Sequence, residues 1–237
     1  MCFSPEASFA GGIVISAIGV VTIRKVHKPS QILFASIPLF FGIQQFAEGL
    51  LWLTLPLTGY YILQRISVYL FLIMAEVIWP IMIPLAVLFM EDSKRKKKIL
   101  SALLLVGVTL SLYYAYCLLF LNVNPQIEGF HIKYHNDFPE SLALAAFIFY
   151  LAATITPLFV SSVIKTHLLA ILMTLSCLVT AIFFTQYLTS VWCFFAALIS
   201  AVVYWILHDT HKEFRLAGLG ILKGDHHTHQ GKFVNPE

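Results

Sequence analysis

Long apolar runs, separated by short polar or charged segments, dominate the pattern of this chain. An apolar run of about 20 residues crosses the hydrocarbon core of a bilayer as one helix. Runs that suit this role, allowing for tilt, cover residues 8–23, 31–55, 61–90, 99–121, 139–160, 168–188 and 191–207. The third run is too long for one straight crossing, and Pro80 and Pro84 inside it predict a bend.

We therefore expect an all-α, polytopic membrane protein with seven transmembrane helices in residues 1–211 and a short, polar, His-rich cytoplasmic tail in residues 212–237. Composition supports this class, because 59% of the residues are hydrophobic and only 11% are charged. The charged fraction is less than half of the roughly 25% that soluble domains carry. No segment alternates apolar and polar residues as the strands of a membrane β-barrel do.

The lysines and arginines predict the orientation. All but two of the 15, Arg65 and Lys133, follow the first, third, fifth or seventh run. The positive-inside rule then places the N-terminus outside and the C-terminus in the cytoplasm. The net charge of +3 is explained by this topology signal, so membrane lipids are the expected partners and nucleic acid is not.

The second run carries an unusual set of polar residues. At helical spacing Gln44 and Glu48 share one stripe, while Gln45, Glu48 and Trp52 share the next. A charged side chain at this depth costs about 2.5–3.5 kcal/mol and marks a functional site by default. We expect Glu48 to be the catalytic or ion-coupling carboxylate, with Gln44, Gln45 and Trp52 against the substrate. A structural pairing of Glu48 with Arg65 or with a glutamine is the alternative.

The predicted orientation also assigns depth to the third run. Arg65 falls near the outer surface and Glu76 near the middle of the membrane. Polar and aromatic residues of several runs converge on the outer half, which predicts a cavity open to the outside. We expect Arg65 and Glu76 to bind substrate there. Glu76 precedes Trp79 and Pro80, where a bent backbone lacks hydrogen bonds, so a local structural role is equally compatible.

A metal site is a further hypothesis. His131 and His135, at i and i+4 in the longest outer loop, lie on one face of either a helix or a strand. Cys2 and Cys193 fall at the same level, and a Cys/His/Glu set can bind zinc or copper. Alternatively, Cys2 and Cys193 form a disulfide in an oxidising compartment, and the sequence does not separate these two readings. Haem is not expected, because no runs carry facing histidines in the middle of the membrane. Retinal is not expected, because the last two runs contain no lysine. Nucleotide is not expected, because the sequence has no phosphate-binding loop.

Four motifs carry a resemblance to a known family. MCFSPEASF at residues 1–9, IQQFAEGLLW at 43–52, WPIMIP at 79–84 and SVWCFFAA at 190–197 resemble an uncharacterised family of small bacterial multi-span membrane proteins, a domain of unknown function. The resemblance implies a location in the bacterial inner membrane and no particular activity. In architecture alone the chain is similar to the seven-span metal-dependent membrane hydrolases, the alkaline ceramidases and progestin/adiponectin-type receptors. Their HxxxH zinc motif is not matched, because His208 and His211 form HxxH.

Three functional hypotheses follow. The first is a metal-dependent membrane enzyme, such as a hydrolase of a lipid or lipid-like substrate, with Glu48 as general base or ligand. The second is a protein that binds, transports or senses a small solute, with the bend at Pro80 as its moving part. The third is an accessory membrane subunit.

Overall fold

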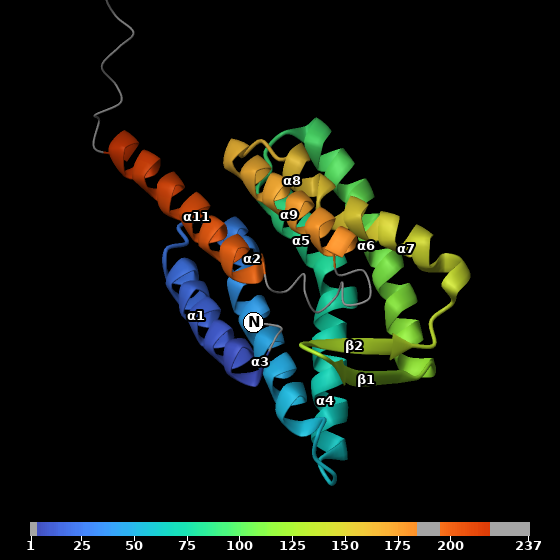
Figure 1. Ribbon diagram of the computed structural model, residues 1–237. Coiled ribbons are helices and arrows are strands. Elements are labelled where there is room, and N and C mark those ends of the chain that lie inside the picture. Colours follow the sequence, from blue (N-terminus) through green and yellow to red (C-terminus); the bar gives the residue numbers. More distant parts are fainter. Residues whose placement is uncertain (1–3, 184–194, 219–237) are drawn as a thin grey trace, which may run out of the picture.

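The computed structural model describes residues 4–183 and 195–218, and their side chains as far as His208. This part of the chain is mostly helical, with one β-hairpin (Figure 1). The first half contains α1 (Pro5–Arg24), the 3₁₀ turn η1 (Pro29–Gln31), α2 (Ile32–Ala35), α3 (Ile37–Thr54), α4 (Tyr61–Leu72), the π-helical turn η2 (Ile73–Ile78) and α5 (Trp79–Met90). The second half contains α6 (Lys94–Phe120), β1 (Val123–Glu128), β2 (His131–Asn136), α7 (Glu140–Thr154), α8 (Thr156–Val160), α9 (Ile164–Phe183) and α11 (Ala196–Gly218).

Six helical segments of the described chain are long and apolar enough to cross a membrane. They are Pro5–Arg24, Pro29–Thr54, Tyr61–Met90, Lys94–Phe120, Glu140–Val160 and Ile164–Phe183. Ala196–His208 is a shorter apolar helix, and the seventh span predicted from the sequence begins at residue 191, outside the described residues. Helix α11 continues past residue 211 to Gly218, beyond the boundary predicted for the tail. The number seven and the orientation of the termini stay predictions.

Apolar side chains cover the outside of the bundle. Leu105 and Leu119 on α6 are 68% and 77% exposed, and Leu144 on α7 is 71% exposed. An apolar surface of this extent is unfavourable in water and suits contact with lipid chains. The polar side chains of Gln44, Gln45 and Glu48 on α3, by contrast, are buried.

The bend predicted in the third span is a π-helical turn. Pro80 and Pro84 have no backbone N–H, so they cannot complete the α-helical hydrogen bonds of the preceding turn. Side chains from other helices bond two carbonyl groups of η2. The Ser111 hydroxyl donates to the Val77 carbonyl at 2.7 Å, and the Tyr150 hydroxyl donates to the Ala75 carbonyl at 2.6 Å. Helices α6 and α7 therefore hold the bend in place.

Two glycines permit close helix packing at this bend and beside it. A Cβ atom added at Gly107 of α6 would overlap the carbonyl oxygen of Pro80. One added at Gly42 of α3 would overlap the Ser16 hydroxyl of α1. A larger residue at Gly107 would push α5 and α6 apart, because the overlapping atom belongs to the backbone, whereas one at Gly42 would require the Ser16 side chain to move.

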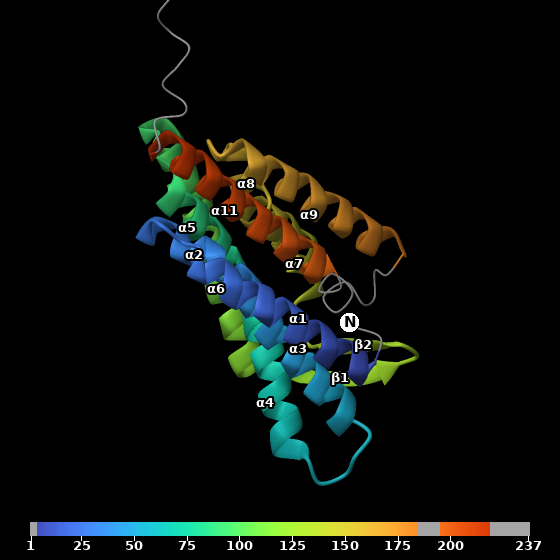
Figure 2. The same ribbon diagram turned by 90° about the vertical axis from the view of Figure 1, so that its left-hand side faces the viewer.

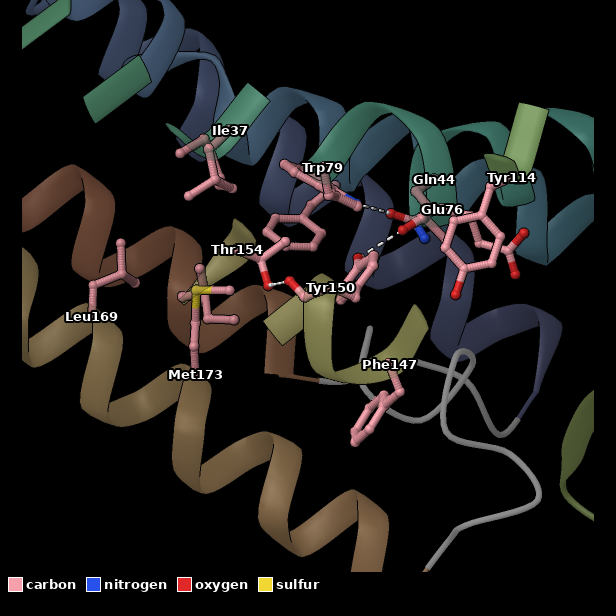
Figure 3. A pocket seen from close by; sticks show the side chains of 14 residues that line it. Ile37, Gln44, Glu76, Trp79, Tyr114, Phe147, Tyr150, Thr154, Leu169 and Met173 are labelled. Carbon is pink, nitrogen blue, oxygen red and sulfur yellow. Dashed lines mark hydrogen bonds between the residues drawn. The ribbon is translucent and has the colours of Figure 1, made fainter. Parts of the chain in front are cut away.

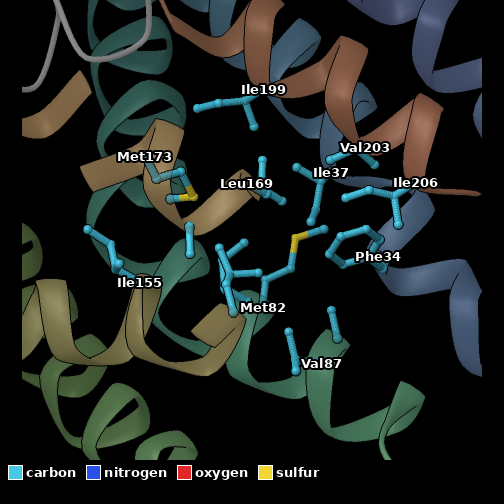
Figure 4. Close-up of a cluster of buried hydrophobic side chains, with 14 of the residues drawn as sticks. Phe34, Ile37, Met82, Val87, Ile155, Leu169, Met173, Ile199, Val203 and Ile206 are labelled. Atoms are coloured by element: carbon cyan, nitrogen blue, oxygen red, sulfur yellow. The ribbon is translucent and has the colours of Figure 1, made fainter. Parts of the chain in front are cut away.

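The larger buried core joins the two halves of the chain (Figure 4). Phe34 and Ile37 from α2 and α3 meet Met82 of α5, Leu169 of α9 and Val203 of α11. Segments far apart in sequence thus pack into one layer around α5. This contact fixes the position of the walls of the cavity described below.

The predicted outer loop forms the antiparallel hairpin β1–β2. Its strands pair from Val123 with Asn136 to Glu128 with His131, and Gly129 at the turn has a φ of 62°. A second apolar cluster, which includes Leu51, Phe71 and Ile132, holds the hairpin against α3 and α4. Figure 2 shows the hairpin beside the end of α3 that leads into α4.

Glu91 connects two turns at the end of the bundle where α5 passes into α6. Its carboxylate is 2% exposed. Oε1 accepts hydrogen bonds from the backbone N–H groups of Asp92 and Ser93 and from the Ser162 hydroxyl, at 3.0, 2.9 and 2.8 Å. Oε2 accepts the Ser162 backbone N–H at 2.7 Å. Burial acts to raise the pKa of Glu91, but these hydrogen bonds outweigh it and lower the pKa.

Candidate functional site

The polar stripe predicted on the second span is buried. Gln45 and Glu48 are fully buried, Gln44 is 1% exposed and Trp52 is 9% exposed. Within the described part of the chain, the side-chain amide of Gln45 and the indole N–H of Trp52 have no hydrogen-bond partner. Buried polar groups are nearly always hydrogen-bonded, so each such group calls for an explanation.

The two glutamines of this stripe face different helices. Gln45 lies towards α1, since its Cβ would be 3.4 Å from a Cβ added at Gly12. Gln44 lies towards α5, where its Oε1 accepts the indole N–H of Trp79 at 3.1 Å. Of these two glutamines, Gln44 lines the cavity described next.

A cavity of about 190 Å³ lies between α3, the π turn, α5, α6, α7, α9 and α11. Figure 3 shows it from close by, with Gln44, Glu76 and Tyr114 towards one end and Ile37, Leu169 and Met173 towards the other. The lining is mostly apolar and aromatic. It consists of Ile37, Phe41, Gln44, Ala75, Glu76, Trp79, Ile83, Tyr114, Phe147, Tyr150, Thr154, Leu169, Met173 and Ile199.

Glu76 is the single acid in this lining, and no lysine, arginine, histidine or cysteine is among the described residues that form it. Its Oε2 atom is buried without a hydrogen-bond partner in the described structure. Glu76 belongs to the π turn, and π turns occur frequently at functional sites. The cavity therefore combines a buried carboxylate with apolar walls.

Hydrogen bonds within the walls hold the other polar groups in place. The Trp79 ring is fixed by its hydrogen bond to Gln44 and by Phe41, whose ring centroid is 4.3 Å away. The Tyr150 hydroxyl donates to the Ala75 carbonyl, and the Thr154 hydroxyl donates to the Tyr150 carbonyl at 2.7 Å. These three donors are occupied by wall atoms, so none of them compensates the Glu76 carboxylate.

The predicted substrate-binding set is only partly brought together. Gln44 and Glu76 line the cavity, whereas Gln45, Glu48 and Trp52 do not. Arg65 lies on α4, where its guanidinium donates to the Tyr69 hydroxyl at 3.0 Å and lies 4.9 Å from the centre of that ring.

Four residues of the lining are not among the site residues predicted from the sequence: Trp79, Tyr114, Tyr150 and Thr154. In the sequence, Tyr150 and Thr154 could have been recognised as two polar side chains four residues apart, and so on one helical face, in the apolar run 139–160.

Lys133 and His135 of the hairpin contact the Glu128 carboxylate. His135 Nε2 and Lys133 Nζ each lie 3.3 Å from Glu128 Oε1, and His131 is the cross-strand neighbour of Glu128. Burial lowers the pKa of His131, which favours its neutral form. No group of three or more His, Cys, Asp or Glu residues suited to a metal ion occurs among the side chains described in residues 4–183 and 195–208. Cys2 and Cys193 lie outside the described residues, so both the metal set and the alternative disulfide are without structural support.

Comparison with protein families places the chain. The sequence model of the family of unknown function DUF6629 matches residues 1–217. The chain belongs to this family. The match runs from the first residue to the end of α11 and includes every residue that lines the cavity. The expectation of an uncharacterised family is thereby confirmed, while its bacterial origin stays a prediction. No curated protein and no solved structure matches the chain.

Proposed function

We propose that this protein binds and transports a small organic solute, with the Glu76 cavity as its binding site. The observation that carries the proposal is the buried Oε2 of Glu76, without a hydrogen-bond partner among the described residues, in a mostly apolar and aromatic cavity. A mostly apolar pocket with a few convergent polar groups is the usual form of a small-molecule site. In keeping with the positive-inside pattern, we place the protein in the bacterial inner membrane with its N-terminus outside.

Transport is favoured over simple binding because Glu76 lies in the π turn itself. A ligand that contacts Glu76 contacts the bend between α4 and α5 directly. Transporters commonly place solute sites at interrupted membrane helices, where the backbone can change its conformation. Ligand binding and a change of bend are thus physically linked at one residue.

The metal-dependent enzyme is the weaker hypothesis. It assigned the chemistry to Glu48, which does not line the cavity, and to a His/Cys set that the described residues do not assemble. The described lining also contains no histidine, lysine or cysteine next to Glu76 to act as a base or nucleophile. A solute site needs none of these groups.

Binding is tested by thermal unfolding of the full chain in maltoside micelles. The probes are benzyl alcohol, benzylammonium, benzoate, choline and 3,3-dimethyl-1-butanol, which sample neutral, cationic and anionic molecules of similar size. We expect at least one probe to raise the midpoint, and Met173→Trp, which fills the cavity, to abolish the increase. Leu175→Trp is the matched control, because Leu175 lies on the same helix and is 52% exposed.

Flux of the binding probe into proteoliposomes tests transport. Glu76→Gln should reduce both binding and flux, and Glu48→Gln should leave binding intact. No stabilisation by any probe would overturn the proposal. A loss of binding in Glu48→Gln with normal binding in Glu76→Gln would move the site to the stripe of α3.

A further inference from the structure

We infer that the ligand is a small organic ammonium ion, with its positive charge at Glu76 and its apolar substituents against the aromatic walls. This inference rests on the proposed function and specifies the chemical class of the solute. It follows from the charge of the cavity, the nature of its walls, their rigidity and its volume.

Charge is the first argument. Glu76 is the single acid in the described lining, and none of the described side chains that reach the cavity from α3, α5, α6, α7, α9 or α11 is basic. A lone ionised carboxylate is costly inside a membrane protein unless a positive group faces it. A cationic ligand supplies that group, whereas an anionic one would add repulsion.

The walls distinguish an organic cation from a metal ion. Hard cations such as Ca²⁺ need about six to eight oxygen ligands. Here the Gln44 Oε1 accepts from Trp79, and apolar groups form most of the remaining surface. An alkylated ammonium gives up little hydration and is attracted to the faces of Trp, Tyr and Phe rings. Five aromatic residues line this cavity: Phe41, Trp79, Tyr114, Phe147 and Tyr150.

The aromatic walls are held in advance of binding. Trp79 is fixed by Gln44 and Phe41, and Tyr150 is fixed by the Ala75 carbonyl. A preformed cage of this kind binds with less loss of conformational freedom than flexible side chains do. The indole N–H of Trp79 and the hydroxyl groups of Tyr150 and Thr154 can turn towards the Glu76 carboxylate only if their hydrogen bonds within the wall break.

Volume limits the size of the ligand. An engineered apolar cavity of about 150 Å³ in another protein holds benzene. The cavity here, at about 190 Å³, has room for a molecule of that size or slightly larger. A trimethylammonium group with a short substituent meets this limit.

The test compares two molecules that differ only in charge. Choline carries a trimethylammonium group, and 3,3-dimethyl-1-butanol has a carbon atom in place of the nitrogen. Binding of each to the wild-type full chain is measured by calorimetry in maltoside, which has no ammonium headgroup. We expect choline to bind at least about tenfold more tightly, because an ion pair and cation–π contacts are both lost with the charge.

Variants assign the preference to Glu76. Glu76→Gln should abolish the difference between the two molecules, and Glu140→Gln should preserve it, because Glu140 is exposed at the start of α7. Equal or tighter binding of the neutral molecule to wild type would overturn the ammonium inference and leave the solute site standing. If no probe binds at all, the proposed function itself fails. The wild-type comparison does not depend on how well any variant folds.

Discussion

Glu91 offers the sharpest test of what holds the bundle together. Its buried carboxylate accepts four hydrogen bonds, which join the α5–α6 turn to Ser162 between α8 and α9. In Glu91→Gln, one oxygen becomes an NH₂ group. The least damaging orientation places the NH₂ group at the position of Oε2, where it faces the Ser162 backbone N–H, another donor. The three hydrogen bonds to the position of Oε1 remain, but they lose the charge of the carboxylate and become weaker.

The cost can be worked from these contacts. An unsatisfied buried donor costs about 1–3 kcal/mol, and the loss of charge weakens the other three bonds, so we expect a total of about 2–4 kcal/mol. At about 2–4 °C per kcal/mol for a chain of this size, the unfolding midpoint falls by about 4–16 °C. Circular dichroism in maltoside micelles measures it. Asp92→Asn, in the same turn but exposed, should change the midpoint by about 1 °C or less.

Acid should remove the difference between the two proteins. The folded state lowers the pKa of Glu91 below its ordinary value of 4.5. Its contribution to stability is therefore complete above that value and is lost as the pH falls through the folded pKa. Wild type and Glu91→Gln should converge at strongly acidic pH. A variant midpoint within about 1 °C of wild type at neutral pH would refute the reasoning, since four hydrogen bonds cannot be replaced without cost.

Three further substitutions probe packing and buried hydrogen bonding inside the bundle. Tyr150→Phe removes the hydrogen bond to the Ala75 carbonyl and should lower stability by about 1 kcal/mol; an unchanged midpoint would show that water replaces it. Gly107→Ala should destabilise the protein by about 1–3 kcal/mol, because the added methyl group overlaps Pro80. Alanine favours a helix over glycine by about 1 kcal/mol, so without close packing the substitution would raise the midpoint, and that result would contradict the prediction. Gln45→Met should stabilise by about 1–3 kcal/mol, because a buried amide without hydrogen bonds is costly; a lower midpoint would reveal a partner outside the described residues.

The tyrosine substitution has a matched control on the bundle surface. Tyr116 on α6 is 60% exposed, so Tyr116→Phe should leave the midpoint unchanged within about 0.5 kcal/mol. All of these midpoints are measured under one detergent condition, because detergent contributes to the stability of the apolar outer face.

The linear pattern of residues determined several features of this protein. Apolar runs of membrane-spanning length identified the six long helices, because the hydrocarbon thickness sets a local requirement on each segment. Helical spacing identified the stripe from Gln44 to Trp52 as one face, and that face is buried. Pro80 and Pro84 predicted the bend, because a missing N–H is a property of the residue itself.

Tertiary structure alone decided which carboxylate faces a cavity. Glu48 was the stronger candidate from spacing, but it is buried away from the cavity, and Gln44 is the member of the stripe that lines it. Glu76 sits in a π turn, where the 3.6-residue period used to assign faces does not hold. Its neighbours Tyr150 and Thr154 come from α7, far along the chain. No local pattern encodes such contacts, because they depend on how separate helices pack against one another.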